Sequence, residues 1–182
     1  MKSIPHLCKL RLPRTPATIP KPPGISQLNL ALMKSDMENI RLLWKRLSDN
    51  AEENGRRIFI KFFTDYPESK RYFKSVPTEG DLHTNSDVAL HGARVINTFN
   101  HVIESMEDWQ KACKLLQRLV DKHKNIHKVP AVTFQHMFQA FLGICQDIMG
   151  DELTNDMLVS WDKFFEAVYD EISVAYGRKR LL

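Results

Sequence analysis

The spacing of apolar residues along most of the chain predicts a protein built from helices. From residue 35 onward, apolar side chains recur every three or four residues, which places them on one face of an α-helix. The alternation of apolar and polar residues between turn dipeptides that typifies a strand is not found. The pattern therefore predicts an all-α fold with six long helices and one or two short ones.

Local signals set the expected ends of these helices. We expect six long helices: one that begins near residue 35, and others over about 52–65, 87–105, 109 to near 130, 130–150, and from 154 past 172. Ser35 with Glu38 forms a capping-box pattern, and Asn85 or Ser86 and Thr154 are further candidate caps. Gly150 is expected to stop a helix, and Gly55 to mark either a break or a close helix contact.

Two of the expected helices each carry a histidine on the apolar face. His91 continues a stripe with Val88, Val95 and Phe99, and His123 continues a stripe of leucines and valine. A single imidazole in such a place is either a core histidine or a metal ligand. Two helices that each present one to the interior could hold a group between them.

Composition divides the chain into three parts. Six of the nine prolines precede residue 24, and residues 1–28 hold five basic residues and no acidic one. We therefore predict a Pro-rich, basic, disordered extension over 1–28, a helical domain over 29–177 and a basic tail over 178–182. The segment 29–177 holds 18 basic and 22 acidic residues, so the basic pI reflects the two ends. This distribution argues against nucleic-acid binding.

The first 28 residues leave other interpretations open. An acid-free segment with serine and threonine could be a mitochondrial presequence, although its prolines disfavour the amphipathic helix that this requires. Cys8 could accept an acyl group, which would let the arm contact a membrane, and the arm could also contact a protein partner. No run of about 18 apolar residues predicts a transmembrane segment.

The three cysteines give no sign of a disulfide framework or a zinc site. Cys8, Cys113 and Cys145 are odd in number and far apart, which suits a reducing compartment and predicts a cytoplasmic location. His123 and His127 have an i, i+4 spacing that zinc could use, but no third ligand is evident.

Six landmarks in the right order make the chain resemble a globin over residues 30–177. They are Trp44, Pro67, Phe73, His91 with Val95, His123 with the corner that ends at Pro130, and Trp161. The separation of His91 and His123 is similar to that in neuroglobin and cytoglobin. The N-terminal extension looks like that of globin X and several nematode globins. The positions of the paired cytoglobin cysteines hold Ala51 and Ala93, so the resemblance does not carry thiol–disulfide control with it.

The resemblance implies haem b as cofactor, with His123 as the proximal ligand of the iron and His91 on the distal side. The other pocket residues it implies are Phe59, Phe73, Val95, Leu119, Val129, Phe134 and Met137, with Arg94 and His127 near the propionates. Phe59 stands where a tyrosine would add a hydrogen bond to the gas ligand, and phenylalanine offers only bulk.

The resemblance leaves two functions open, because His91 has two possible roles. It could donate a hydrogen bond to a gas ligand, which suits a protein that binds dioxygen, NO or CO for transport or storage. It could instead bond the iron, which suits a redox or sensor protein served by a reductase, with at most an activity such as NO dioxygenation or nitrite reduction. A helical interaction module without haem is the third hypothesis, and it leaves both buried imidazoles unexplained.

Overall fold

Six α-helices and three short helical segments make up the described part of the chain, residues 32–177 of this computed structural model, and no strand occurs within it. The α-helices are α2 (Lys34–Ser48), α3 (Ala51–Asp65), α4 (Ser86–Glu104), α5 (Trp109–Asp121), α6 (Val132–Met149) and α7 (Asn155–Ala175). The short segments are the 3₁₀ helices η1 (Pro67–Tyr72) and η3 (Gly150–Glu152) and the π-helical η2 (Lys122–Ile126). The predicted all-α fold is confirmed.

The expectations for residues 1–28 and 178–182 lie outside the described residues. Within 32–177, none of the helices combines the length and the apolar character that a bilayer span requires.

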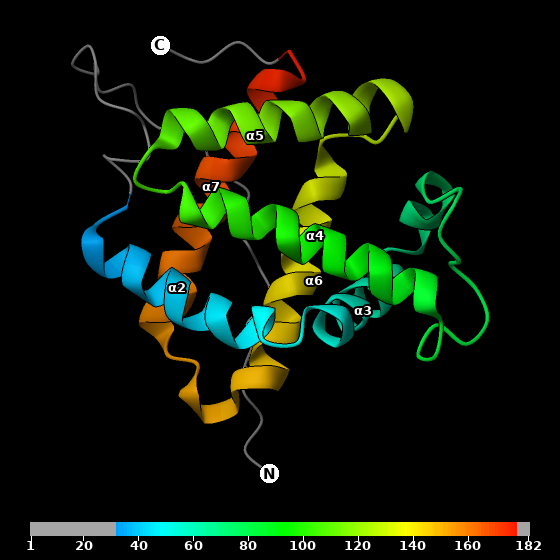
Figure 1. Cartoon of the computed structure of the whole chain (residues 1–182), viewed down its shortest axis with the longest axis horizontal. Helices are drawn as coiled ribbons and strands as arrows, with labels where there is room; N and C mark the ends of the chain where they lie inside the picture. Colours follow the sequence, from blue (N-terminus) through cyan, green and yellow to red (C-terminus); the bar gives the residue numbers. More distant parts are fainter. Residues whose placement is uncertain (1–31, 178–182) are drawn as a thin grey trace.

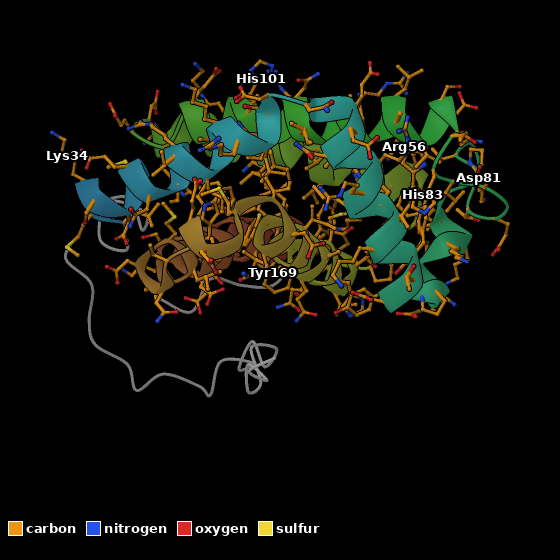
Figure 2. All side chains as sticks on the ribbon, turned by 90° about the horizontal axis from the view of Figure 1, so that it is seen from below. Lys34, Arg56, Asp81, His83, His101 and Tyr169 are labelled. Atoms are coloured by element: carbon orange, nitrogen blue, oxygen red, sulfur yellow. The ribbon has the colours of Figure 1, made fainter. Side chains whose placement is uncertain are left out.

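The helices cross one another in layers around an aromatic core. Figure 1 shows α4 lying across α6 and α7, with α5 along one edge and α2 and α3 towards the other. Figure 2 shows Lys34, at the start of α2, and Asp81, in the loop between η1 and α4, at opposite ends of the molecule. The core contains Trp44, Phe141, Trp161 and Phe165, whose rings pack in series; Trp44 also donates to Asn100 at 2.8 Å. Burying such large apolar surfaces supplies most of the drive to fold.

Several predicted helix ends are confirmed. Asn85 accepts hydrogen bonds from the backbone N–H groups of Asp87 and Val88, and Thr154 accepts one at 3.2 Å from that of Met157. Gly150 ends α6 with a φ of 53°, which a residue without a Cβ adopts at little cost.

The start of α2 differs from the capping box expected at Ser35. The helix begins at Lys34, and the carboxylate of Asp36 accepts the N–H of Met33 at 2.9 Å. Asp36 is held there by the α7 residues Ser160 and Lys163, at 2.9 and 3.0 Å. The contact with α7 therefore determines which residue caps this end of α2.

The segment from Trp109 to Pro130 is not one helix followed directly by another. After Asp121 the chain widens into the π turn η2, and α6 begins only at Val132. Lys128 takes a φ of 58°, which turns the chain back so that the N–H of Val129 donates to the carbonyl of His123 at 2.9 Å. This turn satisfies the carbonyl of His123 and delays the start of α6.

Of the two roles expected for Gly55, a break or a close helix contact, the structure shows the contact, and Gly92 is its partner. A Cβ placed on Gly92 would come within 2.4 Å of the backbone of Gly55, and the reverse placement gives the same distance. The backbones of α3 and α4 therefore touch at this crossing. One turn along α3 lies Phe59, and one residue before Gly92 lies His91.

Candidate haem pocket

His123 projects from η2 and is fixed by its own backbone. Its Nδ1 lies 2.8 Å from the carbonyl oxygen of Leu119. Because a carbonyl can only accept, Nδ1 carries the proton, and Nε2 keeps its lone pair. Burial lowers the pKa of His123, the hydrogen bond to Leu119 opposes that shift, and the charges of His127 and Lys122 add to it. The ring is therefore a neutral imidazole at neutral pH, with one nitrogen able to bind a metal.

His91 lies on α4 against an aromatic wall. Its ring centroid is 4.9 Å from that of Phe59 and 5.7 Å from that of Phe73. Burial lowers the pKa of His91, and the charges of Arg94, His123 and His127 lower it further. His123 is thus near enough to act electrostatically on His91. Within residues 32–177, neither ring nitrogen of His91 has a hydrogen-bond partner.

The aromatic wall comes from α3 and from the residue that follows η1. Phe59 and Phe63 on α3 pack edge-on against Phe73, with ring centroids 5.6 and 5.0 Å away. The contact of Gly55 with Gly92 brings α3 close enough to α4 for Phe59 to reach His91. The expected pocket residues Phe59 and Phe73 therefore lie together on the side of His91.

The side of His123 is formed by α5, η2 and α6. The ring of Phe134 lies 5.2 Å from that of His123, and Val129 is buried beside the turn. Leu119, one turn before His123, is half-buried. Val95 of α4 and Met137 of α6 pack against the cluster that contains Phe59, and both line one small apolar cavity in the core. Phe134 and Val129 thus lie on the side of His123, whereas Val95 and Met137 lie with Phe59.

Arg94 and His127 are both exposed. The ring of His127 is 6.0 Å from that of His123. In the described segment no group of three or more His, Cys, Asp or Glu residues could hold a metal ion, so the zinc alternative for His123 and His127 gains no support.

Two residues that the sequence did not single out make contacts in or with the segment that carries His123. Tyr176, at the end of α7, donates its hydroxyl to the carbonyl of Val129, and Lys124 lies over the ring of Tyr176. A lysine next to His123 has no spacing signal that links it to a tyrosine 52 positions later. Only the packing of α5 on α7 reveals the contact.

The chemistry of this donor set fits haem. A neutral imidazole with a free Nε2, a second imidazole near it, and apolar walls are what an iron porphyrin needs from a protein. A profile described as Globin matches residues 56–172 of the chain. The chain belongs to the globin family. Membership confirms the predicted resemblance, and it implies a haem cofactor and the binding of a diatomic gas such as dioxygen.

Individual relatives of this globin include cytoglobins from fish. The chain is 28% identical over 148 residues to Cytoglobin-2 of Oryzias latipes, covering 80% of this chain and 83% of that one. It is 29% identical over 140 residues to Cytoglobin-2 of Danio rerio, covering 75% and 78%. It is 34% identical over 119 residues to Globin-2 of Mordacia mordax, covering 64% and 77%.

Proposed function

We propose that this globin binds haem b between α4 and the α5–η2–α6 side, with His123 as the proximal ligand and His91 on the distal side. In this proposal it reversibly binds dioxygen, or another diatomic gas such as NO or CO, for transport or storage. The hydrogen bond from His123 Nδ1 to Leu119 at 2.8 Å carries the proposal, because it holds the ring with Nε2 unprotonated. The haem would supply an iron that His123 would hold and that could bind the gas.

The surrounding residues would orient the group and keep water away. Leu119, Val129 and Phe134 would give the proximal side an apolar lining, and Val95 and Met137, which pack against the cluster of Phe59, would complete the apolar wall. Phe73 would pack against the flat face of the porphyrin. Arg94 and His127 would pair with the haem propionates; both are exposed, and the charge of each acts on the pKa of His91.

His91 supports a second candidate function. A neutral imidazole with no hydrogen-bond partner in residues 32–177, near His123, is suited to bond the iron itself. A gas would then have to displace His91, so its apparent affinity would fall by the fraction of open sites. Such a bis-histidyl globin suits redox or sensor work and would need a reductase. Haem-based activities such as NO dioxygenation or nitrite reduction belong with this alternative.

The absorption spectrum of the reduced, ligand-free protein separates the two candidates. A broad high-spin visible band means that His91 is off the iron and supports the gas-binding function. A sharply split low-spin band that becomes high-spin in His91→Leu means that His91 is on the iron. Stopped-flow mixing with oxygen then tests the gas-binding function directly. Oxidation faster than any measurable oxygen complex would contradict a carrier.

We propose a cytoplasmic location for the protein. The support is the chain's three widely spaced cysteines, which suit a reducing compartment. The basic segment 1–28 could instead place it at a membrane or in mitochondria, and a fluorescent fusion with and without residues 1–28 distinguishes these locations.

A further inference from the structure

The exposed face of α5 and the first residue of η2 carry a row of basic side chains. Its members are spaced by three and four residues, which keeps them on one side of the helix: Lys111, Lys114, Arg118 and Lys122. All four are exposed, whereas Ala112, Leu116 and Val120 of the same helix are buried in the core. Figure 1 shows α5 along an edge of the molecule. These four residues, the basic row, therefore point away from the helices on which α5 packs.

The charges of the basic row are not neutralised by the described residues around them. Within residues 32–177 no member of the row forms an ion pair, whereas Arg41 and Arg46 on α2 each have a glutamate partner at 2.9 Å. Residues 109–130 hold six Lys or Arg and one acidic residue, Asp121. The rest of 29–177 holds 12 basic and 21 acidic residues. The helical domain thus gathers its excess of positive charge on this segment.

An exposed aliphatic side chain follows the basic row at the end of η2. Ile126 is 69% exposed, which is more than any other large apolar side chain in the described part of the chain. Lys122 before it and Lys128 after it are exposed as well. A segment that presents cations beside a bulky apolar side chain is suited to the boundary between lipid headgroups and acyl chains.

The described part of the chain also ends close to η2. Lys124 of η2 donates from Nζ to the carbonyl of Ala175 at 3.3 Å, so the last turn of α7 lies against the segment that follows the basic row. The structure describes the chain as far as Gly177, and residues 178–180 are all Lys or Arg. Three more basic residues therefore follow in the sequence from a point next to η2.

We propose that the basic row and Ile126 dock this protein on the surface of an anionic phospholipid bilayer. Each Lys or Arg near such a surface is attracted to phosphatidylserine headgroups, and the attraction fades within a Debye length. Because the apolar face of α5 is buried in the core, the helix would lie on the headgroups, and Ile126 would reach the acyl boundary. The proposal goes beyond the proposed function and does not depend on haem, since all these residues belong to the surface.

Other polyanions fit this face less well. An acidic protein would be attracted by the same charges, but the charges alone leave the exposure of Ile126 without a role. A nucleic acid would gain from aromatic side chains on which its bases stack, and no Phe, Tyr or Trp is exposed on α5. The combination of a row of cations with one aliphatic side chain therefore favours a lipid surface.

Cosedimentation of the full chain with phosphatidylcholine vesicles, with and without phosphatidylserine, tests the docking. Wild type should bind only the vesicles that contain phosphatidylserine, and NaCl should release it. In the triple variant Lys111→Gln, Lys114→Gln, Arg118→Gln we expect binding to fall about tenfold or more. Lys122 is left unchanged because it adjoins His123. The apoprotein and the haem-loaded protein should give the same result.

The matched control removes three exposed lysines from other elements: Lys34→Gln, Lys45→Gln and Lys74→Gln. None of the three forms an ion pair within residues 32–177, and the net charge falls by the same amount. Binding should therefore stay close to that of wild type. Urea midpoints near that of wild type check that both triple variants are folded.

Ile126→Gln tests the apolar part of the docking surface. We expect binding about three- to tenfold weaker, because the acyl boundary no longer receives an aliphatic side chain. Leu42→Gln is the control, since Leu42 is 53% exposed on α2, and it should bind like wild type. Unchanged binding in Ile126→Gln would contradict the role of Ile126.

Three results would overturn the docking surface as a whole. The first is a wild type that does not bind phosphatidylserine vesicles, including one that binds only an acidic protein or DNA. The second is full binding by the variant of the basic row, which would assign any docking to residues outside α5. The third is an equal loss in the two triple variants, which would reduce the effect to net charge.

Discussion

At the scale of single residues, the main feature of the wall beside His91 is that Phe59 offers no polar group. Phe59 packs against His91 with 4.9 Å between ring centres, and it has no polar atom to offer a bound gas. Among the described residues expected around that ligand, His91 alone could donate a hydrogen bond to it. We therefore expect oxygen to dissociate at a moderate rate, and substitutions of Phe59 test this expectation directly.

A hydroxyl at this position should slow the release of oxygen. In Phe59→Tyr we expect oxygen dissociation about tenfold slower, since a charge-assisted hydrogen bond contributes roughly 1.5–3 kcal/mol. Flash photolysis or stopped-flow mixing of the haem-loaded protein measures the rate. Phe59→Leu is the control, because it removes the ring without adding a donor and should not slow release. Equal rates in Phe59→Tyr and wild type would mean that Phe59 does not face the gas.

The sequence was enough to predict some of these residues but not others. His91 and His123 could be found because each closes an apolar stripe at helical spacing, and both prove to be near one another with lowered pKa values. Lys124 and Tyr176 could not be found, since their contact depends on how α5 packs on α7. The spacing of apolar residues shows which face of a helix is buried, but it does not show which other helix packs against that face.

At the scale of elements, the crossing of α3 and α4 positions His91 against Phe59. Gly55 and Gly92 let the two backbones touch, and a Cβ on either would lie 2.4 Å from the other. The existence of the helices followed from apolar periodicity, whereas the π turn at 122–126 and the start of α6 at Val132 did not. The turn between η2 and α6 contains a hydrogen bond from the N–H of Val129 to the carbonyl of His123, which the spacing of apolar residues does not predict.

Filling the crossing should destabilise the protein. For Gly92→Ala we expect a loss of about 1–3 kcal/mol in the free energy of unfolding, because overpacking outweighs the gain in helix propensity. Urea unfolding of the apoprotein measures it. Gly143→Ala in α6 is the matched control: its Cβ would meet only the flexible end of Lys61. It should be neutral or stabilising, and equal losses in both variants would refute the role of the crossing.

At the scale of the whole molecule, three histidines couple stability to pH. Burial is the main cause that lowers the pKa of His91, His123 and His136, while the charge of Glu68 partly opposes it for His136. His136 also stacks on Tyr66 with 4.0 Å between ring centres. When the pKa is lower in the folded state, the unfolded chain binds protons first as the pH falls. Acidification therefore favours unfolding.

The apoprotein should accordingly lose stability between about pH 7.5 and about pH 5.5, around the ordinary histidine pKa. Urea midpoints measured across this range test the expectation, and the slope should be smaller in His136→Gln. A flat profile would show that these rings take up protons equally well in the folded and unfolded states.

The central claim is that His123 bonds the haem iron, and titrating the apoprotein with haem tests it most directly. Wild type should take up one equivalent and keep it when challenged with an excess of a competing apoglobin. His123→Ala should fail to retain haem, whereas His127→Ala, which removes only a proposed propionate contact one turn away, should still take up one equivalent with an unchanged ferrous spectrum. Full retention by His123→Ala with the wild-type spectrum would contradict the claim.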